Sequence, residues 1–194
     1  MKFNKEKLKP LGDGHEKAVY DDPNNPDLAL GIFHEYIDAS VLLIKARFYL
    51  TKITHLLSSE NVPDVHLVSS DPNTIVVDKI QGRDLYEEKD WEKHDADIDA
   101  LKIKLDGLGI NQIDDFRGNF KYDKDENIVY VDSFNPWKSG SPMNPNYDKE
   151  KLEKALQKLK EEKRELGLNY LKRLEVLREE EIKNLQKAGE KDKK

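Results

Sequence analysis

The sequence contains no cysteine among its 194 residues. Disulfides and thiolate metal sites are therefore excluded, although this absence does not assign a compartment, for which the cytoplasm is the default expectation. No stretch approaches the roughly 20 apolar residues that a membrane span needs, and no apolar segment follows the basic start of the chain. We expect a soluble protein with no membrane partner. A non-cleaved secretion signal of the kind that bacterial effectors carry would not be visible by these criteria.

The chain also lacks an excess of positive charge. Its 33 basic and 39 acidic residues are interspersed and give a net charge of −6, which argues against a nucleic-acid partner. The hydrophobic fraction is only 37%, equal to the charged fraction. This composition favours one core with a solvated helical appendage over two full domains. The five histidines show no spacing typical of a metal site.

The first half of the chain alternates short apolar runs with turn-forming residues. A glycine turn, a Pro- and Asn-rich loop at 23–26 and a turn at 71–73 separate runs rich in β-branched residues. One longer run has apolar residues at helical spacing, among them Val41, Ile44, Phe48 and Leu56. The predicted elements are strands at 8–14, 17–22 and 28–33, a helix at 37–57, and strands at 65–70 and 73–80.

The second half predicts a helix at 91–108, ended by Gly107 and Gly109, and then a hairpin with strands at 120–122 and 128–132. A Pro- and Asn-rich loop follows without a secondary-structure signal. From Asp148 onward, leucines recur every three or four positions between charged residues. This pattern predicts an amphipathic helix or a helical pair with a break at Gly167.

Three short motifs carry chemically useful groups. Gly12-Asp13-Gly14 lies between two predicted strands, where glycine amides can approach phosphate oxygens. Asp114 is followed five positions later by Asn119, and Asp132 comes thirteen positions after that. Phosphoryl transfer needs a carboxylate near the attacking hydroxyl and oxygen ligands for Mg²⁺. Each motif taken alone is more typical of an ordinary turn than of a phosphate or metal site.

Taken together, the motifs resemble the protein-kinase superfamily over about two thirds of the chain. Residues 11–20 (Leu-Gly-Asp-Gly-x-x-Lys-Ala-Val-Tyr) resemble its glycine-rich loop, and residues 77–85 resemble its hinge. Residues 114–119 have the spacing of the catalytic loop, and Asp132-Ser133-Phe134 stands in place of Asp-Phe-Gly. The resemblance implies an α+β, bilobal kinase-like fold with a reduced C-lobe and C-terminal amphipathic helices. The implied domains are an N-lobe at 1–84, a C-lobe at 85–147 and a helical extension at 148–194.

The resemblance also implies ATP and Mg²⁺ as cofactors and assigns roles by position. Asp114 would be the catalytic base, and Asn119 and Asp132 would be the Mg²⁺ ligands. The amides of Gly12 and Gly14 would cover the phosphates, and the adenine would lie against the hinge near Asp78 to Ile80.

The sequence departs from the family pattern at several positions. The strand lysine is replaced by Gly31, but Lys17 stands at the place where with-no-lysine kinases carry theirs. Without the resemblance, Lys17 would be a solvent-facing strand lysine. No glutamate occurs in the helix that normally supplies its partner, Gln112 and Ile113 replace the usual His-Arg, and no Ala-Pro-Glu follows. The small size is similar to that of minimal bacterial effector kinases.

Two functions follow from these features. One is an atypical kinase that transfers the γ-phosphate to a hydroxyl, with protein Ser/Thr preferred and a small-molecule acceptor as the other option. The other is an inactive pseudokinase that binds a nucleotide or a partner as a scaffold. Residues 148–194 are expected to offer a helical surface to a protein partner, or to a second copy as a coil.

Overall fold

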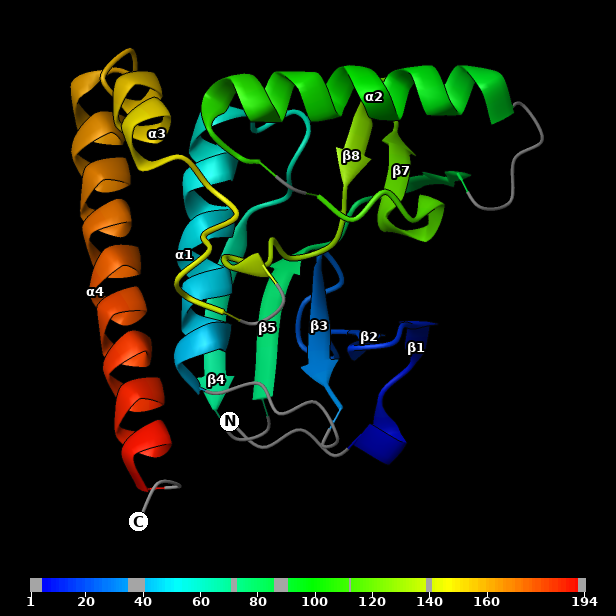
Figure 1. The fold of residues 1–194 in the computed structure, drawn as a ribbon. Helices are drawn as coiled ribbons and strands as arrows, with labels where there is room; N and C mark the ends of the chain where they lie inside the picture. Colours follow the sequence, from blue (N-terminus) through cyan, green and yellow to red (C-terminus); the bar gives the residue numbers. More distant parts are fainter. Residues whose placement is uncertain are drawn as a thin grey trace.

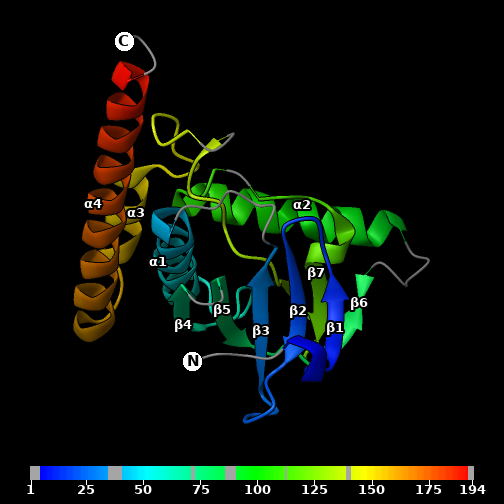
Figure 2. The same ribbon diagram turned by 90° about the horizontal axis from the view of Figure 1, so that it is seen from below.

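The N-terminal half of the chain forms a five-stranded antiparallel sheet beside one long helix (Figure 1). The structure is a computed structural model that describes residues 5–34, 41–70, 73–85, 91–111, 113–138 and 141–191. After a short 3-10 helix at Lys5–Lys7, the sheet has the order β1-β2-β3-β5-β4, which is visible from below in Figure 2. Its strands are β1 (Pro10–Asp13), β2 (Lys17–Asp21), β3 (Leu28–Phe33), β4 (Val65–Ser70) and β5 (Asn73–Asp78).

The register of β2 on β3 places the site residues on one face of the sheet. Lys17 pairs with Phe33, and Val19 pairs with Gly31. Directly paired residues share a face, as do residues two apart on a strand. Lys17 therefore lies on the same face as Gly31 and close to it. The central strand β3 is buried from Ala29 to Phe33, as expected for a strand paired on both sides.

Helix α1 (Val41–Leu57) connects β3 to β4 and packs Ile44, Leu50 and Ile53 into the core. The expected start of this helix at residue 37 lies outside the described residues. Val41 was expected on the buried face, but its side chain is 43% exposed because it begins the helix, beyond the packed part.

The second part of the chain contains helix α2 (Trp91–Leu108) above a three-stranded sheet of order β6-β7-β8. The strands are β6 (Gly82–Asp84), β7 (Phe120–Asp123) and β8 (Ile128–Tyr130). Strand β6 was not predicted. Strand β8 ends at Tyr130 instead of residue 132, although the Val131 amide still donates to the Asn119 carbonyl at 2.8 Å, in the same register as the β7–β8 pairing.

Two helices end the described chain: α3 (Lys149–Leu156) and α4 (Glu161–Lys191). The break predicted at Gly167 is wrong, since the chain turns between Leu156 and Glu161. Gly167 lies inside α4, where the absence of a side chain lets the helix approach Leu156 closely. Leu156 is fully buried, so this close approach belongs to the core.

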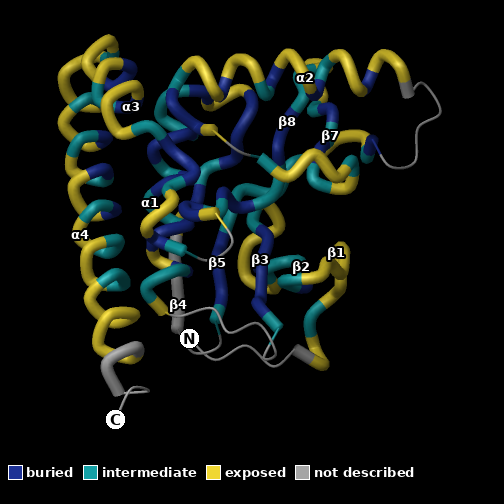
Figure 3. Tube along the Cα trace, viewed as in Figure 1, coloured by how far each residue is buried: buried dark blue, intermediate teal, exposed yellow. Residues whose placement is uncertain are grey.

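Helix α4 lies along α1, and this is the most extensive packing of a helix in the described part of the chain (Figure 1). Leu171 and Leu174 of α4 are buried, and the buried side of the helix faces α1 in Figure 3. Together these elements confirm the α+β fold class: a five-stranded sheet with one long helix is followed by a smaller sheet and by α2, α3 and α4. No helix in the ranges given above is long and apolar enough to cross a membrane.

Candidate active site

A cavity of about 1000 Å³ opens between the glycine turn, α1, the 113–119 loop and the segment after β8. It collects motifs that are far apart in the sequence. Six of the eight predicted site residues line it: Gly12, Gly14, Lys17, Asp114, Asn119 and Asp132.

The side chain of Lys17 crosses Gly31 and reaches Asp132. A β-carbon at position 31 would lie 3.2 Å from Lys17 Cδ, so the lysine stem occupies the space beside the glycine. The Nζ group pairs with Asp132 Oδ1 and lies 3.3 Å from Ser133 Oγ. The side chain is only 15% exposed. Lys17 is thus a cavity residue, and the alternative of a solvent-facing strand lysine is wrong.

Asp132 remains a carboxylate in this setting. Burial would raise its pKa, but the charge and hydrogen bond of Lys17 and the backbone amide of Ser133 outweigh burial and hold the pKa below its ordinary value. The Ser133 amide donates to Asp132 Oδ1 at 2.7 Å. The ionised carboxylate of Asp132 is therefore fixed on the cavity wall, where its oxygens can act as ligands.

The loop that carries Asp114 and Asn119 is ordered by its own hydrogen bonds. The Phe116 amide donates to Asp114 Oδ1 at 3.0 Å, which forms a turn stabilised by the aspartate itself. The Asn119 Nδ2 group lies 3.5 Å from the Asp114 carbonyl. Arg117, from the same loop, pairs with Asp95 at 2.7 Å. Asp114 is exposed and can be reached from solvent.

Three aromatic rings join the segments of the site. Tyr130 stacks in tilted geometry on Phe120 at 5.3 Å and on Phe134 at 4.9 Å between ring centroids. Phe120 follows Asn119 directly, and Phe134 comes two residues after Asp132. Burial and then the charge of Asp132 raise the pKa of Tyr130 well above its ordinary value, so this ring is neutral. The aromatic cluster therefore ties the Asn119 and Asp132 segments to one rigid support.

Sequence reasoning missed Arg47 and Glu16 on the cavity wall. Arg47 comes from the middle of α1 and donates to both carboxylate oxygens of Glu16, at 2.6 and 3.1 Å. Its side chain is 2% exposed. The sequence feature that could have identified Arg47 is its position as the one charged residue on the otherwise uncharged buried face of α1.

The hinge residues are not among those that line the cavity. The Asp78 carboxylate lies 2.5 Å from His66 Nε2 and accepts from the Asp64 amide at 3.2 Å. Neither Asp78 nor Ile80 lines the cavity, so their contact with adenine stays a prediction. A second space of about 30 Å³ adjoins Lys17, and its wall includes Val19, Ile75 and Val77.

The site offers oxygen donors of the kind that Mg²⁺ prefers. Asp132 supplies a carboxylate, and Asn119 supplies an amide oxygen because its nitrogen is directed to the Asp114 carbonyl. In the part of the chain that the structure describes, no three His, Cys, Asp or Glu side chains are grouped to hold a metal by themselves. A Mg²⁺ ion held here would therefore take its remaining ligands from phosphate and water, as is usual for this ion.

No family model matches the chain, and no curated protein matches it. Among solved structures, the chain is similar to the crystal structure of the Mycobacterium tuberculosis PknI kinase domain, with a TM-score of 0.47 and 17% identity. That similarity covers 77% of this chain and 71% of the other. A double mutant and a single mutant of the same domain give TM-scores of 0.46 and 0.45 at 17% identity. These two cover 77% of this chain, and 72% and 70% of the mutant chains.

Proposed function

We propose that this chain is a minimal, atypical kinase that uses ATP and Mg²⁺ to phosphorylate a hydroxyl group. The observation that carries this proposal is the cavity. It gathers two glycines, a lysine, a solvent-accessible aspartate and two oxygen donors from three separated motifs. Phosphoryl transfer requires these groups and depends mainly on positioning and charge stabilisation.

In the proposed reaction, the acceptor hydroxyl oxygen attacks the γ-phosphorus, and the bond from that phosphorus to the β–γ bridging oxygen breaks. Asp114 receives the hydroxyl proton, and ADP leaves with the bridging oxygen. The amide of Gly12 and the ammonium group of Lys17 bind phosphate oxygens. The Gly14 amide donates to the Lys17 carbonyl at 3.0 Å, so it joins them only if that bond opens when nucleotide binds. Asn119 and Asp132 would hold Mg²⁺, which when bound neutralises charge on the β- and γ-phosphates.

The relocated lysine is part of the proposal. Lys17 takes the role of the strand lysine, as in with-no-lysine kinases, because its stem lies over Gly31 and its ammonium group faces the cavity. Without nucleotide, this ammonium group neutralises Asp132. With nucleotide bound, the ammonium group would pair with a phosphate oxygen, and the Asp132 carboxylate would then be available to hold Mg²⁺.

The preferred acceptor is a Ser or Thr side chain of a protein. Asp114 is exposed, and the neighbouring Phe116 is 58% exposed at the mouth of the cavity. An open rim with an apolar side chain suits an extended polypeptide better than a small polar molecule, which is usually enclosed. We place this activity in the cytoplasm, with residues 1–84 and 85–147 as the two lobes and 148–194 as the extension.

A second candidate is a pseudokinase scaffold. It is favoured by one observation: α1 carries Arg47, a cation, at the cavity wall where the family pattern has a glutamate. In that case nucleotide, or a protein partner of the 148–194 segment, would bind without phosphoryl transfer. Leu171 and Leu174 are buried against the body of the protein, so such a partner would meet the exposed Leu166, Val176 and Leu185.

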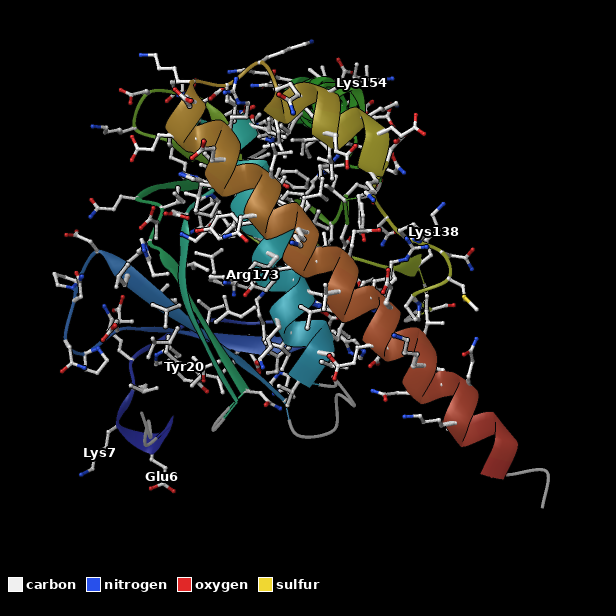
Figure 4. The ribbon with its side chains drawn as sticks, turned by 90° about the vertical axis from the view of Figure 1, so that its left-hand side faces the viewer. Glu6, Lys7, Tyr20, Lys138, Lys154 and Arg173 are labelled. Atoms are coloured by element: carbon white, nitrogen blue, oxygen red, sulfur yellow. The ribbon has the colours of Figure 1, made fainter. Side chains whose placement is uncertain are left out.

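The test is thermal unfolding with ATP and Mg²⁺, together and separately, followed by transfer of labelled γ-phosphate to a protein acceptor. The variants are Lys17→Ala and Asp132→Asn. The control is Lys154→Ala, which removes an exposed lysine on α3 that does not line the cavity (Figure 4). We expect metal-dependent stabilisation and transfer in the wild type and the control, and loss of transfer in both site variants. Binding without transfer selects the scaffold. If the wild type shows neither binding nor transfer, the kinase and the nucleotide-binding scaffold are both overturned. Full transfer in Lys17→Ala overturns the relocated lysine.

A further inference from the structure

Arg47 and Glu16 form an ion pair at the cavity that is joined by two hydrogen bonds. Both guanidinium nitrogens NH1 and NH2 engage the carboxylate, in the fork geometry that gives arginine pairs their strength and direction. Arg47 is 2% exposed and Glu16 is 39% exposed. The arginine is therefore the anchored partner, and the glutamate is the partner that it holds.

The pair connects α1 to the start of β2. Glu16 directly precedes Lys17, and its carbonyl accepts from the His34 amide at 3.0 Å. Phe33, which is paired with Lys17 in the sheet, lies between the two cations. Its ring centroid is 5.4 Å from Arg47 Cζ and 5.9 Å from Lys17 Nζ. A fixed Glu16 thus restricts the backbone from which the Lys17 side chain emerges.

Helix α1 is itself held from its other side. The Arg173 guanidinium of α4 donates to Tyr49 Oη at 3.2 Å, and the Tyr49 and Tyr170 rings pack at 5.8 Å. Figure 4 shows α4 crossing over α1, with Arg173 near the middle of the crossing. Arg47, which holds Glu16, therefore lies on a helix whose position is restrained by α4.

We propose that Arg47 is a positioning residue that, through Glu16, holds Lys17 and the glycine turn in place for a nucleotide phosphate. The pair has the opposite polarity to the lysine–glutamate pair of the family pattern, with the cation on the helix and the carboxylate on the strand side. The contribution of the Arg47–Glu16 pair to nucleotide binding rests on the function proposed above. The restraint that the pair places on the glycine turn does not depend on that function.

The alternative is that Arg47 binds phosphate itself, and a double-mutant cycle separates the two roles. The variants are Arg47→Gln, Glu16→Gln and both together. If Arg47 acts through Glu16, each single change and the double change raise the Kd for ATP with Mg²⁺ by the same factor, about tenfold. If Arg47 contacts phosphate, Arg47→Gln weakens binding far more than Glu16→Gln, and this result overturns the proposal.

A second measurement needs no nucleotide. Amide hydrogen exchange at residues 12–17 should accelerate in both Arg47→Gln and Glu16→Gln. The matched control is Lys52→Gln on the same helix, which breaks a comparably buried pair with Asp64 (2.7 Å) that does not line the cavity. Glu16 is the more exposed partner, so Glu16→Gln should leave the protein folded even if Arg47→Gln does not, and the test can then be made on that variant.

The outcomes are distinguishable from failure of the proposed kinase function. If the wild type binds no nucleotide, the kinase proposal fails and hydrogen exchange alone decides the positioning role. Faster exchange at 12–17 in both variants but not in Lys52→Gln supports it. Unchanged exchange in the two variants, or equal acceleration in the control, overturns it.

Discussion

The ammonium group of Lys17 and the carboxylate of Asp132 meet across the cavity, although 115 positions separate them in the chain. This pair joins β2 of the large sheet to the segment after β8. Both side chains are mostly buried, at 15% and 23% exposure. A buried pair contributes little net stability when intact, but removing one partner leaves an uncompensated charge. The effect of such a change must therefore depend on whether Asp132 is ionised.

We expect Lys17→Met to destabilise the protein most at neutral pH. With Lys17 present, the pKa of Asp132 is below its ordinary value, so the contribution of the pair exists above about pH 4 and is lost as pH falls further. Without Lys17, the Ser133 amide and the charge of Arg47 remain as the groups that oppose burial, so we expect the pKa of Asp132 to rise relative to the wild type, and protonation at low pH relieves the buried charge. Removing one partner of a partly buried pair should cost about 2–3 kcal/mol at pH 7, and less below pH 4.

Urea unfolding at several pH values between 7 and 3.5 measures this change. Lys154→Met is the control, because this exposed lysine should show no such dependence. A difference between wild type and Lys17→Met that is constant over the whole pH range would contradict the assignment.

The packing of α4 on α1 predicts a sharp contrast between two leucines of the same helix. Leu174 is fully buried, whereas Leu185 is 51% exposed. Leu174→Ala should lower the free energy of unfolding by about 2–5 kcal/mol, because it leaves a cavity in the core. Leu185→Ala should change it by less than about 0.5 kcal/mol. Denaturant unfolding compares the two variants, and equal effects would mean that α4 does not pack on α1 as described.

Most strands and α2 could be predicted because local signals define them. Strands β3 and β4 begin and end at the predicted residues, 28–33 and 65–70, since β-branched runs are bounded there by turn residues. Helix α2 spans the predicted 91–108. Strand β6 was missed because three residues carry no periodicity, and only its pairing with β7 creates it.

The candidate site could be predicted in part for a different reason. The order of three motifs placed Lys17, Asp114 and Asp132 together, although no local pattern links them. Arg47 was missed because the family pattern directs attention to a glutamate on α1, whereas the observed pair has its carboxylate on Glu16. Which charged residue of a helix faces a cavity depends on tertiary packing, and sequence spacing leaves this open.

Gly82 explains why β6 can lie against β7, and its replacement should detach the strand. A β-carbon at position 82 would overlap the carbonyl oxygen of Tyr122, which is backbone and cannot move aside. Gly82→Ala should cost about 1–3 kcal/mol and accelerate amide exchange in β6 and β7. Arg83→Ala on the same strand removes an exposed ion pair with Glu126 and the contact of the guanidinium with the Tyr122 ring, but it creates no backbone collision, so it should change stability by about 1 kcal/mol or less. Equal exchange in the two variants would contradict the close approach.

Two helical glycines should respond in opposite directions to the same substitution. Gly107 in α2 has open space around it, so Gly107→Ala should stabilise the protein by up to about 1 kcal/mol through helix propensity. Gly167 in α4 lies against the buried side chain of Leu156, and an added methyl group there must displace a packed core residue. Overpacking of this kind costs about 1–3 kcal/mol, which exceeds the gain in propensity.

The double variant Gly167→Ala/Leu156→Ala tests the cause, because removing the Leu156 side chain removes the collision. Leu156→Ala should therefore cost less in the Gly167→Ala background than in the wild type, with a coupling energy of about 0.5–3 kcal/mol in urea unfolding. Additive costs would mean that Gly167 is not the contact that brings α4 close to α3.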